Sequence, residues 1–142
     1  MSFVLDACVA LLWLAPATNP VGASYAERVL HAIRHGAKIL APNLFALEVA
    51  NVAAKLESKG IIREADALRY FSLLGQLGIR YVETLPSAAF GQILHLAKQH
   101  RLSAYDAAYL HLAVTQGIGI ATLDSDLSRA AEAMGVDIAR WA

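Results

Sequence analysis

Five acidic side chains stand in apolar stretches of this sequence, where an isolated charge is costly. They are Asp6, Glu48, Asp106, Asp124 and Asp126, and Asp6 is the only charged residue in the segment 2–15. A buried carboxylate needs hydrogen-bond donors, a cationic partner or a bound cation. Ligand sets made only of carboxylate oxygens suit Mg²⁺ or Mn²⁺. The pattern therefore predicts a divalent metal site.

Four of these acids also have a simple local explanation. Asp6 precedes a short predicted helix and can cap its first turn. Ser103 and Asp106 fit the S-x-x-D pattern of a capping box. Asp124 and Asp126 stand where a strand ends and a helix begins, and acids stabilise that end of a helix. Each role is plausible alone, so the local alternative stays open for each residue taken singly.

The alternative to a functional role is strongest for Glu48, because Glu favours helices and an exposed helical side chain would explain it. Asn51 follows one turn later and is placed to orient Glu48 or a bound water. Local roles would require several helix and strand ends to carry an acid in an apolar setting by coincidence. One shared metal site explains all of these acids together, and we favour that interpretation.

Short apolar runs alternate with stretches of helical periodicity along the chain. Strands are predicted at residues 3–5, 38–41, 80–83 and 118–123, with a possible edge strand at 136–138. Helices are predicted at residues 7–14, 21–35, 44–58, 64–77, 87–100, 103–116 and 125–134. This order predicts an α/β fold of three layers, in which helices flank a central, mostly parallel sheet of four or five short strands. Ligands bind at the carboxyl ends of such strands, where Asp6 and Asp124 stand.

The composition fits one domain over residues 1–142, with 57% hydrophobic and 17% charged residues. Twelve Lys and Arg balance twelve Asp and Glu, which argues against a uniformly basic nucleic-acid-binding surface. Setting aside Asp6, Glu48, Asp106 and Asp124 leaves twelve basic residues against eight acidic ones. The charge balance therefore permits an RNA substrate without indicating one.

The N-terminal segment and the cysteine content indicate a cytoplasmic protein. Cys8 is the only cysteine, so no internal disulfide forms and a reducing compartment is expected. Residues 9–17 resemble the apolar core of a signal peptide, but Asp6 stands where a basic region is required. The same run is shorter than the ~20 residues of a membrane helix. We expect an intact N-terminus and no membrane attachment.

Other catalytic and metal-binding patterns are absent from the sequence. There is no zinc motif, phosphate-binding P-loop or G-x-S-x-G nucleophile elbow. Cys8 has no neighbouring His and is predicted to be a core residue rather than a nucleophile. Five histidines are predicted to lie at the surface or in packing, and the two tryptophans in the core: His31, His35, His95, His100, His111, Trp13 and Trp141.

Four segments of the chain together resemble a known family. These are VLDACVAL at residues 4–11, APNLFALEVANV at 41–52, LSAYDAAYLHLA at 102–113 and ATLDSDL at 121–127. In that order they are similar to the PIN domain, and most similar to the VapC toxins of bacterial toxin–antitoxin pairs. The resemblance implies that the catalytic acids are Asp6, Glu48, Asp106 and Asp124. It also implies that Asp6, Asp106 and Asp124 hold the metal, with Asp126 as an assisting acid.

The resemblance further implies an activity and partners. The expected function is that of a metal-dependent endoribonuclease, the toxin component of a type II toxin–antitoxin system. A water activated by Mg²⁺ or Mn²⁺ would hydrolyse RNA phosphodiester bonds, leaving a 3′-hydroxyl and a 5′-phosphate. A homodimer and a cognate antitoxin protein are the expected partners. Members of the family commonly carry Ser or Thr where this chain has Cys8, and a thiol is a poorer partner for a hard cation.

Two other functions compete with this one. The first is a catalytically silent PIN-fold module that only binds RNA or protein. The second is a phosphatase similar to the haloacid dehalogenases, which need a second Asp at the position of Cys8. Candidate phosphate contacts lie at helix ends, although solvated charges are the simpler interpretation of each: Lys55, Lys59, Arg63, His100 and Arg101.

Overall fold

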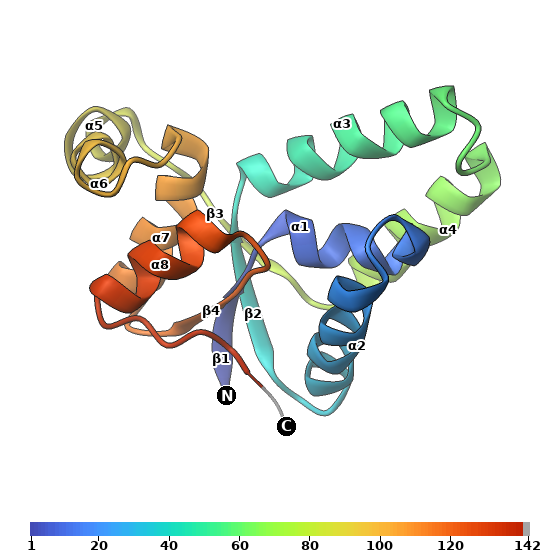
Figure 1. Cartoon of the computed structure of the whole chain (residues 1–142), viewed down its shortest axis with the longest axis horizontal. Helices are drawn as coiled ribbons and strands as arrows, with labels where there is room; N and C mark the ends of the chain where they lie inside the picture. The colour runs from blue at the N-terminus through green and yellow to red at the C-terminus, as the bar shows by residue number, and fades with distance from the viewer. Residues whose placement is uncertain (141–142) are drawn as a thin grey trace.

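The computed structural model of the chain describes residues 1–140 and has a parallel sheet at its centre (Figure 1). Its strands within this range are β1 (Ser2–Leu5), β2 (Lys38–Pro42), β3 (Arg80–Val82) and β4 (Gly119–Ala121). They lie in the order β3-β2-β1-β4, and every pairing is parallel. Phe3, Val4 and Leu5 are almost fully buried, because β1 has a neighbour on each side and helices above and below. The predicted α/β architecture is confirmed.

The helices of the first half of the chain lie on one side of the sheet (Figure 1). They comprise α1 (Ala7–Ala10), the 3₁₀ turns η1 (Leu11–Trp13) and η2 (Pro16–Thr18), α2 (Pro20–Arg34), α3 (Leu44–Ser58) and α4 (Glu64–Gln76). The predicted helix at 7–14 is therefore a single α-turn followed by a 3₁₀ turn. Trp13, predicted in the core, is half-buried and donates from Nε1 to the Ala26 carbonyl at 2.7 Å.

The helices of the second half cover the other side (Figure 1). They comprise α5 (Pro86–Ala88), the π-helical turn η3 (Ala89–Ile93), α6 (Leu94–His100), α7 (Ala104–Gln116) and α8 (Ser125–Ala133). The prediction of one continuous α-helix at 87–100 is wrong, because a π-helical turn at Ala89–Ile93 separates α5 from α6. A π turn adds a residue to the helical repeat without changing residue type, so apolar spacing alone does not reveal it.

Residues 137–139 lie beside β4, and no strand is formed there within the described residues. Ile138 makes one isolated parallel bridge to Ile120, so the possible edge strand at 136–138 is reduced to this contact. Gly119 lies against the same segment, and a Cβ at this position would come 2.8 Å from the Asp137 carbonyl oxygen. Glycine is needed at this position because the two backbones approach so closely. Trp141, predicted to lie in the core, falls outside the described residues.

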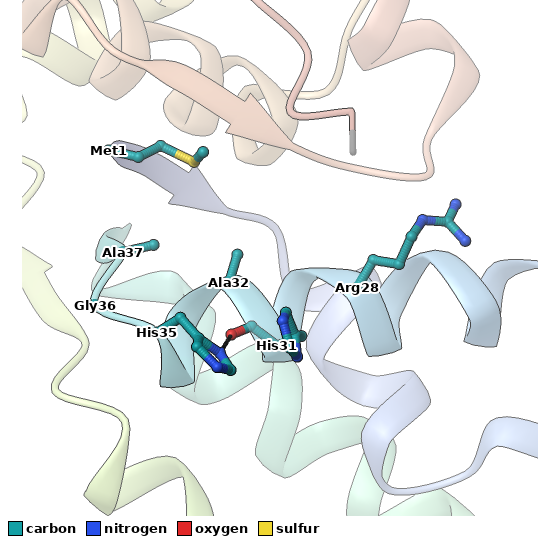
Figure 2. Close-up of a pocket in the computed structure, with 7 residues that line it drawn as sticks. All are labelled: Met1, Arg28, His31, Ala32, His35, Gly36 and Ala37. Atoms are coloured by element: carbon teal, nitrogen blue, oxygen red, sulfur yellow. Dashed lines mark hydrogen bonds between the residues drawn. The ribbon is translucent and has the colours of Figure 1, made fainter. Parts of the chain in front are cut away.

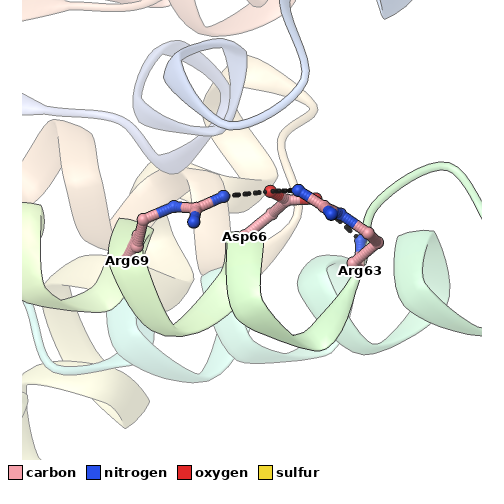
Figure 3. Close-up of polar contacts among 3 residues, drawn as sticks. All are labelled: Arg63, Asp66 and Arg69. Atoms are coloured by element: carbon pink, nitrogen blue, oxygen red, sulfur yellow. Dashed lines mark hydrogen bonds and ion pairs between the residues drawn. The ribbon is translucent and has the colours of Figure 1, made fainter.

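Helix α4 begins with a compact charge cluster (Figure 3). The Asp66 carboxylate accepts from the Arg63 backbone nitrogen at 2.9 Å and from the Arg69 guanidinium at 2.6 Å. The carboxylate thereby satisfies a backbone donor near the helix start and pairs with two cations. Further along α4, the Tyr70 hydroxyl donates to the Ala10 carbonyl at 2.5 Å, which fixes the helix against α1.

Among residues 1–140, the helices are all too short or too polar to cross a membrane.

The features that matter for the site lie at the carboxyl edge of the sheet. Strands β1 and β4 are neighbours, and the Asp6 backbone nitrogen continues their pairing by donating to the Ala121 carbonyl at 3.0 Å. The segments that follow these two strands therefore start side by side.

Candidate functional site

Asp6 is held in the protein interior directly after β1. Its side chain is 4% exposed, and Oδ2 accepts from the Thr122 hydroxyl at 2.7 Å and from the Cys8 thiol at 3.1 Å. Oδ1 accepts from the Cys8 backbone nitrogen at 3.4 Å, so Asp6 also caps α1. Burial raises the pKa of Asp6 above its usual range, although these hydrogen bonds oppose the rise. The ionised carboxylate is thus a costly feature of the folded state.

Thr122 connects Asp6 to the second acid of the sheet edge. Its hydroxyl donates to Asp6 and accepts from the Asp124 backbone nitrogen at 3.0 Å. The Asp124 side chain caps α8 by accepting from the Leu127 nitrogen at 2.8 Å. The charge of Asp124 contributes to the raised pKa of Asp6, which places the two carboxylates within electrostatic range. The local capping roles and the gathering of acids therefore coexist.

Glu48 enters the same region from α3. It is half-buried rather than fully solvated, and its Oε1 accepts from the Tyr109 hydroxyl at 2.7 Å. Tyr109 is fully buried in α7, so this bond ties Glu48 to the helix on the opposite side of the sheet. Burial raises the pKa of Glu48, and the charges of Asp6 and Asp106 add to the rise. Tyr109 takes the orienting role predicted for Asn51, which is exposed.

Asp106 completes the group from the first turn of α7. The Ser103 hydroxyl accepts from the Asp106 backbone nitrogen at 3.0 Å, which confirms the predicted helix start. Burial, and then the charges of Asp124 and Asp6, raise the pKa of the half-buried Asp106 carboxyl. The four predicted catalytic acids thus act on one another electrostatically, although they come from four separate segments.

Asp126 differs from these four acids. Its carboxylate accepts from the Arg129 guanidinium at 2.8 Å, and its side chain is 63% exposed. It still contributes a small part of the raised pKa of Asp106, so it lies at the margin of the acidic group. Asp126 is therefore paired with the Arg129 side chain, whereas Asp6 has no ion pair within residues 1–140. None of the ion pairs formed within residues 1–140 involves Asp6, Glu48, Asp106 or Asp124.

Cys8 occupies the position beside the buried carboxylate. Its thiol donates to Asp6 and accepts from the Leu123 backbone nitrogen at 3.5 Å. Burial, and then the charge of Asp6, raise the pKa of the thiol far above its usual range. The thiol is thus protonated at neutral pH, which agrees with the prediction that Cys8 is no nucleophile. It packs against the core, as predicted, and also belongs to the polar network of the site.

The donor chemistry of this group fits a divalent cation. Four carboxylates without a cationic partner present only oxygen ligands, and hard ions such as Mg²⁺ and Mn²⁺ prefer such ligands. As the side chains lie, no three His, Cys, Asp or Glu residues within residues 1–140 converge closely enough to hold an ion together. The Glu48 carboxylate accepts from Tyr109, and the Asp124 carboxylate accepts from the Leu127 nitrogen.

Thr122 and Tyr109 are the two site residues that sequence reasoning missed. Thr122 follows β4 directly, and its position at the carboxyl end of a central strand was a usable signal. Tyr109 lies one turn after Asp106 on α7, which places the two on the same helix face. From the sequence alone, Thr122 resembles an ordinary residue at a strand end and Tyr109 an ordinary core residue.

The basic residues predicted to contact phosphate have different surroundings. Lys55 and Lys59 are exposed near the end of α3, whereas Arg63 is engaged with Asp66. The His100 carbonyl accepts from Arg129 at 3.1 Å, and Arg101 ends α6 in the left-handed conformation. Lys55, Lys59 and Arg101 are thus exposed, and none of the ion pairs within residues 1–140 involves them.

Comparison with known proteins identifies the fold and the family. The family model described as "PIN domain" matches residues 3–133. The crystal structure of PAE2754 from Pyrobaculum aerophilum superimposes with a TM-score of 0.68, covering 92% of this chain and 84% of that chain at 20% identity. This likeness supports a shared fold. No curated protein sequence matches the chain.

Proposed function

Because this chain belongs to the PIN-domain family, we propose that it is a metal-dependent endoribonuclease whose centre is formed by Asp6, Glu48, Asp106 and Asp124. PIN domains are generally nucleases and typically use divalent metals. The proposal narrows this general activity to RNA as substrate and to Mg²⁺ or Mn²⁺ as cofactor.

One observation carries the proposal. Asp6 is almost fully buried, its pKa is raised by burial, and it lies within electrostatic range of three other carboxylates. A fold that gathers uncompensated negative charge loses stability unless something positive binds there. Acids with raised pKa values at the ligand-binding edge of a parallel sheet are typical of functional sites.

The chain supplies two kinds of group to this chemistry. Asp6, Asp106 and Asp124 would hold the cation, with Asp126 as an outer acid. The bound cation would neutralise phosphate charge and acidify a water molecule. We assign Glu48 as the base that accepts a proton from the attacking water, because burial raises its pKa and so makes the carboxylate a stronger base. Tyr109 holds Glu48 in one orientation.

We further propose that the protein is the toxin of a type II toxin–antitoxin pair. Two large apolar side chains flank the acids: Leu47 beside Glu48 is 75% exposed and Tyr105 beside Asp106 is 67% exposed. Exposed apolar side chains at the rim of an acidic site favour a protein segment that covers it. The same apolar character supports the proposed homodimer. The antitoxin itself is expected from the resemblance to the VapC toxins, and the exposed Leu47 and Tyr105 support a covering protein segment.

The experiment is a cleavage assay on total RNA with purified, partner-free protein. Mg²⁺ and Mn²⁺ are compared with EDTA, and the product ends are mapped. Glu48→Gln is compared with Glu57→Gln, because both change a Glu to Gln on α3 and Glu57 is exposed near the helix end. Loss of a general base lowers the rate by about 10²–10⁴-fold. We expect that loss for Glu48→Gln and wild-type cleavage for Glu57→Gln.

The outcomes separate this proposal from the catalytically silent module. Cleavage that needs a metal ion and Glu48, and that leaves a 3′-hydroxyl and a 5′-phosphate, supports the nuclease. Equal cleavage by both variants, or cleavage that persists in EDTA, contradicts the assignment. RNA binding without cleavage in either metal, by protein shown to be folded, favours the silent binding module.

A further inference from the structure

Two histidines line a cavity at the edge of the sheet opposite the carboxylates. His31 and His35 lie at the end of α2 and border a cavity of about 470 Å³, with Met1 on its opposite wall (Figure 2). Met1 precedes β1 and Asp6 follows it. A strand rises about 3.3 Å per residue, so the cavity and the carboxylate centre are about 16 Å apart along β1. The two places can therefore be studied separately.

The two imidazoles lie close together at the end of α2. Residues four apart on a helix lie on the same face, and the ring centroids of His31 and His35 are 4.0 Å apart. His35 Nδ1 lies 2.8 Å from the His31 carbonyl oxygen. A carbonyl only accepts hydrogen bonds, so Nδ1 is the donor in this contact and Nε2 is the ring nitrogen left for an ion. Histidines that bind metals are commonly fixed in this way by a carbonyl.

The hydrogen bond of His35 has a simpler role, since it satisfies a carbonyl at the end of α2. That role does not account for the second imidazole stacked beside it or for the cavity that both rings border. Arg28 also borders the cavity, but its guanidinium lies 5.9 Å from the Tyr25 ring centroid and extends away from the imidazoles (Figure 2). The surroundings of the pair therefore leave space for a cation.

We propose that His31 and His35 form a binding site for a transition-metal ion such as Ni²⁺ or Zn²⁺, separate from the carboxylate centre. Imidazole nitrogen suits these borderline ions, whereas Mg²⁺ prefers oxygen. The Met1 thioether across the cavity, or water, would complete the coordination. Because both ligands lie where α2 ends, the ion stabilises the turn that leads into β2. This site does not depend on nuclease activity.

The test is a calorimetric titration of the untagged protein with Ni²⁺. The measurement is made in an Asp6→Asn, Asp124→Asn background, which removes the charges of the two sheet-edge acids and leaves the histidines intact. We expect one Ni²⁺ per chain in this background. His31→Ala or His35→Ala should weaken its binding about tenfold or more, because one of two ligands is lost. Circular dichroism melts confirm that each variant is folded.

His95→Ala is the matched control, because His95 is an exposed histidine on α6 that borders a different cavity. Its Ni²⁺ affinity should equal that of the parent. Equal Ni²⁺ affinity in all three histidine variants would overturn the proposal, as would a complete loss of binding in the Asp6→Asn, Asp124→Asn background. Inorganic phosphate that binds in place of Ni²⁺, in a manner abolished by His31→Ala, would identify an anion site and also overturn it.

Discussion

Replacing Asp6 by Asn should stabilise the metal-free protein while removing its metal response. Burial raises the pKa of Asp6 above its ordinary value of 3.8, so the folded protein holds this proton more tightly than the unfolded chain does. The contribution of Asp6 to the free energy of unfolding therefore falls as the pH rises through the window above 3.8. Its cost therefore grows as the pH rises and the carboxyl loses its proton. Asn has no proton to lose and does not incur this cost.

The size of the effect follows from the surroundings of Asp6. The hydrogen bonds from Thr122 and Cys8 already favour the charged form, yet burial outweighs them. Asn is close in shape to the protonated acid, so the substitution removes the charge with little change in packing. Single stabilising substitutions commonly add about 0.5–2 kcal/mol to stability. In a domain of this size, that gain corresponds to a rise in Tm of about 2–6 °C.

The assay is thermal unfolding of wild type and Asp6→Asn at pH 7.5 and pH 5, in EDTA and with Mn²⁺. In EDTA, Asp6→Asn should melt higher at pH 7.5, and its advantage should shrink at pH 5. Mn²⁺ should raise the Tm of wild type much more than that of Asp6→Asn. Asp137→Asn, a change at an exposed acid of the opposite edge, should stay within about 0.5 kcal/mol. A lower Tm for Asp6→Asn in EDTA at pH 7.5 would refute the reasoning.

Three further predictions concern groups around the site and the fold. Tyr109→Phe removes a hydrogen bond that lowers the pKa of Glu48. The acid limb of the pH–rate profile should therefore shift to higher pH, and kcat should fall up to about tenfold. An unchanged profile would show that Glu48 does not need this hydrogen bond. Gly119→Ala places a Cβ 2.8 Å from a backbone carbonyl and should cost about 1–3 kcal/mol in urea unfolding. Gly75→Ala meets nothing within 4 Å inside α4 and should instead add about 0.5–1 kcal/mol, and the same effect for both glycines would contradict this account. The paired Arg63 and Arg69 hold the pKa of Asp66 at about 2, below its ordinary 3.8, so its stabilising effect is complete above pH 4 and is lost between about pH 4 and 2. Melts of Asp66→Asn and wild type should therefore differ at pH 6 and converge near pH 2.

The sheet and most helices could be predicted because buried parallel strands appear as short apolar runs and amphipathic helices show periodicity. The strand residues Phe3, Val4 and Leu5 illustrate this, since each is buried on both faces of the sheet. The π turn at Ala89–Ile93 and the weak pairing of Ile138 could not be predicted. Both depend on backbone hydrogen bonding that residue types do not specify.

The acids could be predicted because charge is rare in this sequence and its cost within apolar segments is large. The hydroxyl groups that hydrogen-bond to the acids could not be predicted. Thr122 donates to a residue 116 positions away, and Tyr109 to one 61 positions away. Such contacts arise only when the sheet assembles. Asp6 and Asp124 cap α1 and α8 and also lie within electrostatic range of each other, so a local role and the gathering of the acids are compatible.

The most direct test of the central claim is an anomalous difference map from crystals of the protein grown with Mn²⁺. We predict a peak at the carboxyl edge of the sheet, bounded by Asp6, Asp106 and Asp124. The carboxylates of Asp106 and Asp124 should turn toward the ion. Crystals of Asp6→Asn grown in the same way should lack this peak. A peak confined to another part of the molecule, or equal peaks in both proteins, would contradict the claim that these acids form a metal centre.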